Sequence, residues 1–337
     1  MDPVRTTPDR FPDSIRRTSS IDTTRPDGLL GDLVISARAR DLRTGPDGTA
    51  SAVAEAELGA RADGRTRTLL SLDTVPALLS PDLLIGAVVG PGFRGRLAEA
   101  APLEADATTL LHLLLDDLPG AGLVSGYSMQ RGGALDGPRR QGTAPPGRPA
   151  AGSPARGFRD DLCAGWAHDA TMMVTIRNQG VIPLAIGPPA PGLERPDDPW
   201  AWHDMPPLAP HSMRRRRRLD VIGTPDPGTF RVDVHFRDSH MDEDGAESVV
   251  HEYCVSGRID AAAGRVVEMA AEARVLPWME CPGAVASAGR LVGMRLADLR
   301  TWVRREMTGA STCTHLNDTL RSLGDVTALV SALGGGS

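Results

Sequence analysis

The sequence predicts an α+β protein built from two related β-β-β-α-α units. In two separate regions, three segments alternate apolar and polar residues at the period of a half-buried strand, with Gly- and Asp-rich turns between them. Apolar segments of helical character follow each group. The strands are expected at 29–42, 50–62, 66–75, 230–238, 249–259 and 265–276. The helices are expected at 83–101, 108–118, 296–307 and 313–333, with a further one beginning at Cys281.

Short matching sequences suggest that the two units arose by internal duplication. Arg40-Asp41 ends the first expected strand of one unit, and Arg237-Asp238 ends that of the other. His112 and His315 occupy matching positions in the helical segments of the two units. The offset rises from 197 residues for Arg40 and Arg237 to 203 for the histidines, as small loop insertions would produce. The sequence therefore predicts a pseudo-dimer whose packing buries the sheet faces.

Changes in composition divide the chain into five parts. They are a disordered N-terminal tail at 1–27, a first unit without cysteines at 28–129, a Gly/Pro/Arg-rich linker at 130–157, an irregular arm at 158–212 and a second unit at 213–333 that carries the Cys/His site. Five consecutive arginines begin at Arg214. They could form an anion or nucleic-acid patch, but the preferred interpretation is a strand whose arginines face solvent or pair with acids.

Composition excludes several classes of protein. All 37 basic residues are arginines, so neither a Schiff-base lysine nor a Walker phosphate loop is present. A net charge of −6 argues against a general nucleic-acid or membrane binder. No stretch has the length of a membrane span, and the N-terminus lacks the apolar core of a signal peptide. Four dispersed cysteines fit a reducing compartment, so a cytoplasmic location is expected.

Soft metal ligands gather in the second unit, and they are the best candidates for chemistry. Cys281 precedes a proline at an expected helix start, where the helix dipole favours the thiolate. Cys313 and His315 could share one ion at the start of another helix. Cys254 and His251 fall on opposite faces of a strand, so at most one of them faces the site. Asp238, with nearby histidines and acids, could form a hard-metal site, although a solvated turn is preferred.

Residues 254–287 also resemble the scaffold proteins of iron–sulfur cluster assembly, the IscU/NifU N-terminal family. The similarity lies in Cys254, the hairpin that follows it, CPGA from Cys281 and the Cys-Thr-His sequence from Cys313. It implies an IscU/SufE-like second unit with an iron–sulfur cluster. The chain also resembles an uncharacterised bacterial family of unknown function that carries CPGA and CTHLND.

The function predicted first is a carrier of a soft metal, an iron–sulfur cluster or persulfide sulfur. Its expected metal ligands are Cys281, Cys313, His315 and Cys254. One alternative is a cysteine- or zinc-dependent enzyme acting on a small organic substrate, with Cys281 and His315 as catalytic candidates. The other is a structural or interaction protein with buried cysteines. Expected partners are a small-molecule substrate or a sulfur- or metal-donor protein, with a homodimer as a further possibility.

Overall fold

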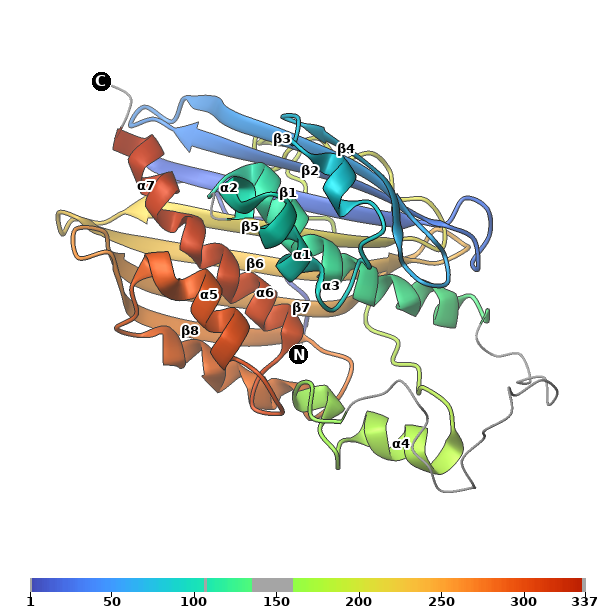
Figure 1. Ribbon diagram of the computed structural model, residues 1–337. Coiled ribbons are helices and arrows are strands. Elements are labelled where there is room, and N and C mark those ends of the chain that lie inside the picture. The colour runs from blue at the N-terminus through green and yellow to red at the C-terminus, as the bar shows by residue number, and fades with distance from the viewer. Residues whose placement is uncertain (1, 106–107, 135–159, 335–337) are drawn as a thin grey trace.

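The computed structural model describes residues 2–105, 108–134 and 160–334. They form an eight-stranded antiparallel sheet with helices over one face (Figure 1), which confirms the α+β class. The strand order is β4-β3-β2-β1-β5-β6-β7-β8. The strands are β1 Ser14–Thr24, β2 Leu33–Thr44, β3 Ala50–Ala62, β4 Leu69–Val75, β5 Met213–Gly223, β6 Thr229–Met241, β7 Glu247–Asp260 and β8 Arg265–Val275.

The helical layer is organised around α3, which packs against five strands drawn from both halves of the sheet. The α-helices are α1 Phe93–Ala100, α2 Pro102–Ala105, α3 Leu110–Arg131, α4 Thr171–Gln179, α5 Leu296–Glu306, α6 Thr314–Ser322 and α7 Val326–Gly334. Short 3-10 helices are η1 Pro81–Leu84, η2 Ala164–Trp166, η3 Cys281–Leu291 and η4 Leu323–Asp325. No helix in the described part of the chain is both long enough and apolar enough to span a membrane.

The centre of the sheet differs from the sequence-based expectation. Residues 1–27 were expected to be a disordered tail, but β1 lies within them and pairs with both β2 and β5. Each half therefore contributes four strands instead of three. The expectation failed because β1 has the sequence SIRRTSSIDTT, in which apolar residues do not alternate with polar ones.

The strand order is symmetric about the pairing of β1 with β5. Arg16 of β1 pairs with Asp220 of β5, and Arg214 of β5 pairs with Asp22 of β1. The two units thus share one sheet and exchange equivalent ion pairs across its centre. This symmetry supports the internal duplication, which stays a prediction.

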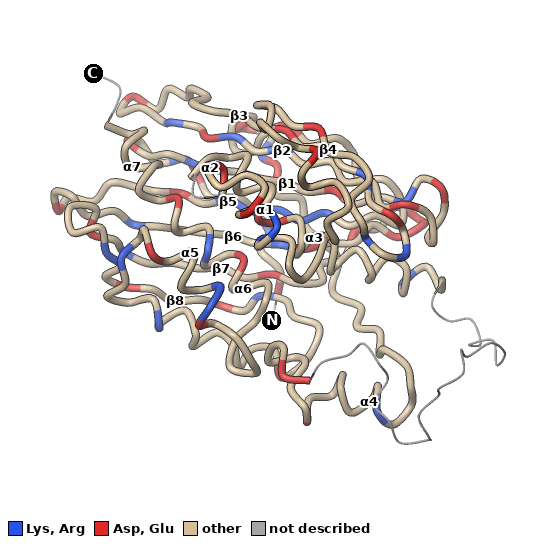
Figure 2. The backbone as a smooth tube through the Cα atoms, viewed as in Figure 1, with Lys and Arg blue, Asp and Glu red and all other residues tan. Residues whose placement is uncertain are grey.

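The arginine run from Arg214 forms the core of β5, and none of its five side chains faces solvent. Each of these residues is at most 6% exposed. Because successive strand residues point to opposite faces, Arg215 and Arg217 face the helices while their neighbours face the other side. That other side is covered by the N-terminal residues and by the segment around Leu193. Blue and red segments accordingly lie together in the middle of the sheet (Figure 2).

On the helical side, buried ion pairs link the sheet to its helices. Arg215 donates to Asp238 of β6 at 2.8 and 3.0 Å and to Asp318 of α6 at 2.8 Å. Arg17 likewise connects Asp41 of β2 with Asp325. A separate apolar core lies in each half, beside this polar centre. The buried charges have partners of opposite sign, which offset part of the cost of burying them.

The linker and the arm, which connect the two halves of the sheet, compare differently with the sequence-based expectation. Most of the predicted linker at 130–157 lies outside the described residues, and its first two residues end α3. The arm is largely irregular, as expected, but it contains the helix α4. Gly180 ends this helix in the left-handed conformation, at φ 71°.

Candidate functional site

A bulge in the sheet brings Asp238 and His251 together on the helical side. Asp238 lies opposite His251 in the β6–β7 ladder, and the next pair is Ser239 with Val249, so Val250 is the extra residue. A bulge redirects the side chains beside it. The bulge therefore places His251 next to the carboxylate of Asp238.

His315 reaches the same point from the start of α6. Cys313 is the N-cap residue of this helix, with extended backbone angles, and His315 is the second helical residue. The side chain of Asn317 fixes this end of the helix by donating to the carbonyl of Met307 at 2.7 Å. The buried apolar residues Leu316 and Leu320 hold α6 against the core of the second half. The imidazole of His315 is thereby pointed at the sheet.

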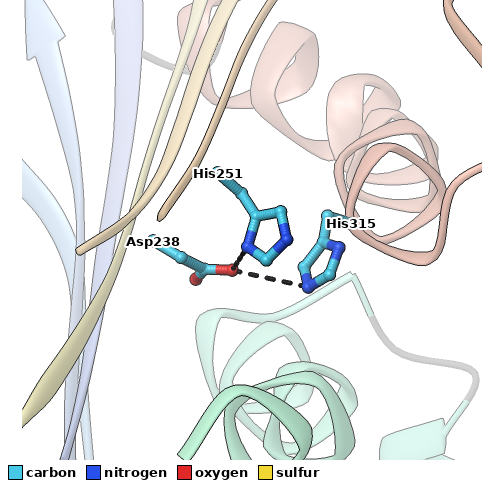
Figure 3. Close-up of side chains that lie close together, drawn as sticks. All are labelled: Asp238, His251 and His315. Atoms are coloured by element: carbon cyan, nitrogen blue, oxygen red, sulfur yellow. Dashed lines mark ion pairs between the residues drawn. The ribbon is translucent and has the colours of Figure 1, made fainter. Parts of the chain in front are cut away.

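The three side chains converge on one oxygen atom (Figure 3). Oδ2 of Asp238 lies 3.5 Å from Nδ1 of His251 and 3.7 Å from Nε2 of His315. The two imidazole rings stack with their centroids 3.7 Å apart and their planes 19° apart. One ligand atom from each residue lies within 4.8 Å of the other two, a spacing that could hold a metal ion. Neither of the two nitrogens has a hydrogen-bond partner among the described residues.

The charges at this site suit metal ligation. Burial, followed by the neighbouring His251, lowers the pKa of His315 to about 3, so this imidazole is neutral at pH 7. Burial alone would raise the pKa of Asp238, but the ion pair with Arg215 holds it well below its usual range. Neutral imidazole and ionised carboxylate are the forms in which these side chains bind metals.

A largely apolar cavity of 340 Å³ adjoins the histidines. His251 and His315 form part of its wall, and so do Cys163, Cys281 and Cys313. Most other lining residues are aromatic or aliphatic, including Tyr127, Trp166, Met172, Ile182 and Trp278. A few polar groups at one side of an apolar cavity are typical of small-molecule sites.

The thiols in this cavity are protonated at neutral pH. Burial, together with the nearby Cys313, raises the pKa of Cys281 and of Cys163 to about 12. Burial also raises the pKa of Cys313, which lies beside the hydroxyl group of Tyr253. Cys281 stands at the start of η3, as expected, but burial outweighs the effect of the helix end. The expected thiolate at Cys281 is therefore not favoured in the metal-free protein.

The predicted ligands have different positions. Of Cys254, Cys281, Cys313 and His315, only His315 belongs to the group that converges on Asp238. Cys281 and Cys313 line the cavity, and metal binding by their thiols stays a prediction. Tyr253 of β7 faces Cys313 on the helical side. Because successive residues of a strand point to opposite faces, Cys254 lies on the other face of the sheet.

Three residues of the site were not among the ligands predicted from the sequence. His251 was weighed only as an alternative to Cys254, and the bulge that selects it leaves no clear pattern in the sequence. Asp238 was weighed as part of a hard-metal site, but a solvated turn was preferred, whereas the structure buries its side chain in β6. Cys163 lies in the arm, where irregular structure hides its approach to the cavity.

The comparisons with known proteins identify one family. Residues 213–329 match the family described as "Protein of unknown function (DUF2889)". This region contains CPGA, CTHLND and the three residues of the site, Asp238, His251 and His315. No match supports the resemblance to iron–sulfur scaffold proteins, which stays a prediction. No curated protein and no solved structure matches the chain. The matched residues cover the second half of the sheet and the helices that follow it.

Proposed function

We propose that this protein binds a divalent transition-metal ion, zinc or iron(II), through His251, His315 and Asp238. The ion would face the adjoining cavity and act on a small organic ligand held there. The observation that carries this proposal is the convergence of two unpartnered imidazole nitrogens on one carboxylate oxygen.

The distances favour a cation over direct hydrogen bonds. Separations of 3.5 and 3.7 Å are longer than normal N–H···O bonds. Metal–ligand bonds of about 2.0–2.1 Å in a tetrahedral site place neighbouring ligand atoms about 3.3 Å apart. Small side-chain movements would therefore bring both nitrogens and the oxygen to bonding distance of one ion.

The surroundings of His315 also favour a free nitrogen at Nε2. Its Nδ1 lies 3.4 Å from Oγ1 of Thr314 and 3.8 Å from Sγ of Cys313, so a proton on Nδ1 has two acceptors nearby. The lone pair of Nε2 then faces a carboxylate, an arrangement that is unfavourable without a cation between them. Arg215 would orient this carboxylate from behind, as outer-shell partners of metal ligands do.

Three protein ligands leave coordination positions for water or for a ligand in the cavity. Two histidines and one carboxylate suit zinc and non-haem iron(II). Such an ion would polarise a carbonyl group or activate a water molecule. This supports a metal-dependent enzyme over a thiol-based carrier, because the thiols of the cavity are protonated.

Equilibrium dialysis of the full-length protein against Zn²⁺ and Fe²⁺ tests the proposal. His251→Ala and His315→Ala should each lower the affinity for the metal ion by about tenfold to a hundredfold or more. Cys281→Ala is the matched control, since Cys281 lines the same cavity but lies outside the three-residue group. Wild type and this control should each bind one equivalent. Loss of binding in Cys281→Ala with retention in His251→Ala would instead support the thiol carrier.

A further inference from the structure

A second cavity, of 310 Å³, is lined by α3 and lies next to the metal-site cavity. Its walls are the chain near Arg25, the turn that contains Arg65 and Arg67, and residues of α3 from Gly122 to Met129. Three arginines thus surround one cavity. None of them forms an ion pair with a carboxylate of the described residues, in contrast to the buried arginines of the central strands.

The positive charge of this cavity is not neutralised by its own walls. Burial, followed by the like charge of Arg67, lowers the pKa of Arg25, which shows that these two guanidinium groups repel each other. The nearby acid is Asp32, and its carboxylate is already bound by Arg61 at 2.7 Å and by the backbone N–H of Gly64 at 3.2 Å. In addition, Nε of Arg25 is buried without a hydrogen-bond partner among the described residues. Nη1 of Arg25 and Nη1 of Arg67 donate to the uncharged backbone carbonyls of Gly31 and Gly122, so an anion would satisfy the free Nε donor and balance the charge.

The turn that carries two of the arginines is held in a fixed shape. Oδ1 of Asp63 accepts hydrogen bonds from the backbone N–H groups of Arg65 and Thr66. Arg67 has φ 59°, in the left-handed region that non-glycine residues seldom adopt. Gly64 permits close packing on the neighbouring turn, since a Cβ there would lie 2.2 Å from the carbonyl oxygen of Gly31. The backbone from which Arg65 and Arg67 extend is therefore in place before any ligand binds.

The two cavities share part of their walls. Leu123 and Gly126 of α3 line both of them. A Cβ atom on Gly126 would meet nothing within 4 Å, so the helix surface is open at this point. A ligand crossing α3 here would pass over Gly126 beside the exposed side chain of Leu123, and its apolar part would then enter the cavity lined by Tyr127 and Trp278.

From this arrangement we infer that the protein binds an amphipathic anion, with a carboxylate or phosphate at Arg25, Arg65 and Arg67 and an apolar chain that crosses Gly126 into the metal-site cavity. The inference names a ligand class for the cavity used by the proposed function, but it does not require the metal. Its test can therefore be carried out on metal-free protein, where failure would leave the metal site unaffected.

Calorimetric titrations of full-length protein in EDTA test the inference with four probes: decanoate, decyl phosphate, the uncharged decanol and inorganic phosphate. One of the two charged amphiphiles should bind at least tenfold more tightly than decanol. The preferred one tells a carboxylate ligand from a phosphate ligand. Binding should also change the tryptophan fluorescence, because Trp166 and Trp278 line the apolar cavity.

Two kinds of variant test binding of the anionic end and of the apolar chain of the ligand separately. Arg65→Gln and Arg67→Gln should weaken the preferred amphiphile about tenfold and leave decanol unchanged; Arg65 is exposed, so its variant should fold normally. Gly126→Leu should weaken the amphiphile but not inorganic phosphate, since it blocks only the crossing. Decanol binding as tightly as both charged amphiphiles, or arginine variants without effect, would overturn the anion site. An unchanged amphiphile affinity in Gly126→Leu would overturn the spanning ligand.

Discussion

Removing Arg215 should destabilise the protein severely, because this side chain joins the sheet to α6 in a buried position. It is 2% exposed and contacts both Asp238 and Asp318. Asp318 would still form ion pairs with Arg94, at 3.2 Å, and Arg321, at 2.7 Å. The removal of Arg215 therefore mainly leaves Asp238 without its charged partner. Breaking a buried pair by removing one partner costs about 3–5 kcal/mol. We expect a loss of this size in the free energy of unfolding for Arg215→Met.

The pH dependence of this loss has a definite sign. In the wild type the folded-state pKa of Asp238 is depressed, so its stabilisation is present above the unfolded value of about 3.9 and is lost as pH falls below it. Without Arg215, burial raises the folded-state pKa of Asp238 above the unfolded value. Its penalty is then full at pH 7 and shrinks as the pH falls through that raised value. The difference between variant and wild type should therefore be smaller at pH 5 than at pH 7.

Urea denaturation followed by circular dichroism at both pH values measures this effect. Adding Asp238→Leu to Arg215→Met should recover much of the stability, since an apolar pair often replaces a buried ion pair without loss. The control is Arg258→Met, which removes an exposed pair with Glu268 and should cost less than about 1 kcal/mol. A loss below about 1 kcal/mol for Arg215→Met, or none recovered by the second substitution, would refute the reasoning.

Three further predictions concern the site and the helix beneath it. Zinc at one hundred times its dissociation constant should stabilise the wild type and the control variant His112→Gln against unfolding by about 2.7 kcal/mol. The same zinc concentration should not stabilise His315→Gln. Denaturation with and without the metal measures both effects. Iodoacetamide should alkylate Cys281 very slowly at pH 7 in the folded, metal-free protein, because its pKa is about 12; rapid reaction would contradict the burial argument. Gly120→Ala should destabilise the protein by about 1–3 kcal/mol, since the added Cβ would lie 2.0 Å from a guanidinium nitrogen. Gly126→Ala in the same helix has open space around the added Cβ and should stabilise the protein by up to about 1 kcal/mol. Equal effects of the two variants on the urea midpoint would refute this contrast.

The outer strands of the sheet could be predicted from the sequence; of the two central strands, β5 was interpreted as a strand but β1 was not, and the burial of both was not foreseen. β3, from Ala50 to Ala62, was expected at these bounds because it alternates and ends at clear turns. β1 and β5 are buried on both faces, where apolar runs are usual, yet they are rich in arginine, serine and threonine. Their burial depends on acids that come from other strands, from α3 and from α6. Such long-range pairing leaves no local periodicity in the sequence.

The candidate site was predicted in part for a similar reason. His315 could be found because it stands beside a cysteine at an expected helix start. The partners of His315 depend on the register of β6 with β7 and on a one-residue bulge, which decides whether His251 or Cys254 faces the helices. The burial of Cys281 was not foreseen because it depends on the arm, whose structure the sequence pattern did not indicate.

X-ray absorption spectroscopy of the protein loaded with one equivalent of Zn²⁺ tests the central claim most directly. Nitrogen and oxygen ligands lie about 2.0–2.2 Å from zinc, whereas a thiolate sulfur lies at about 2.3 Å and scatters more strongly. If His251, His315 and Asp238 hold the ion, the first shell contains only nitrogen and oxygen, with the outer-shell signature of two imidazoles. One or more sulfur atoms in the first shell would contradict the account and place the metal on the cysteines of the cavity.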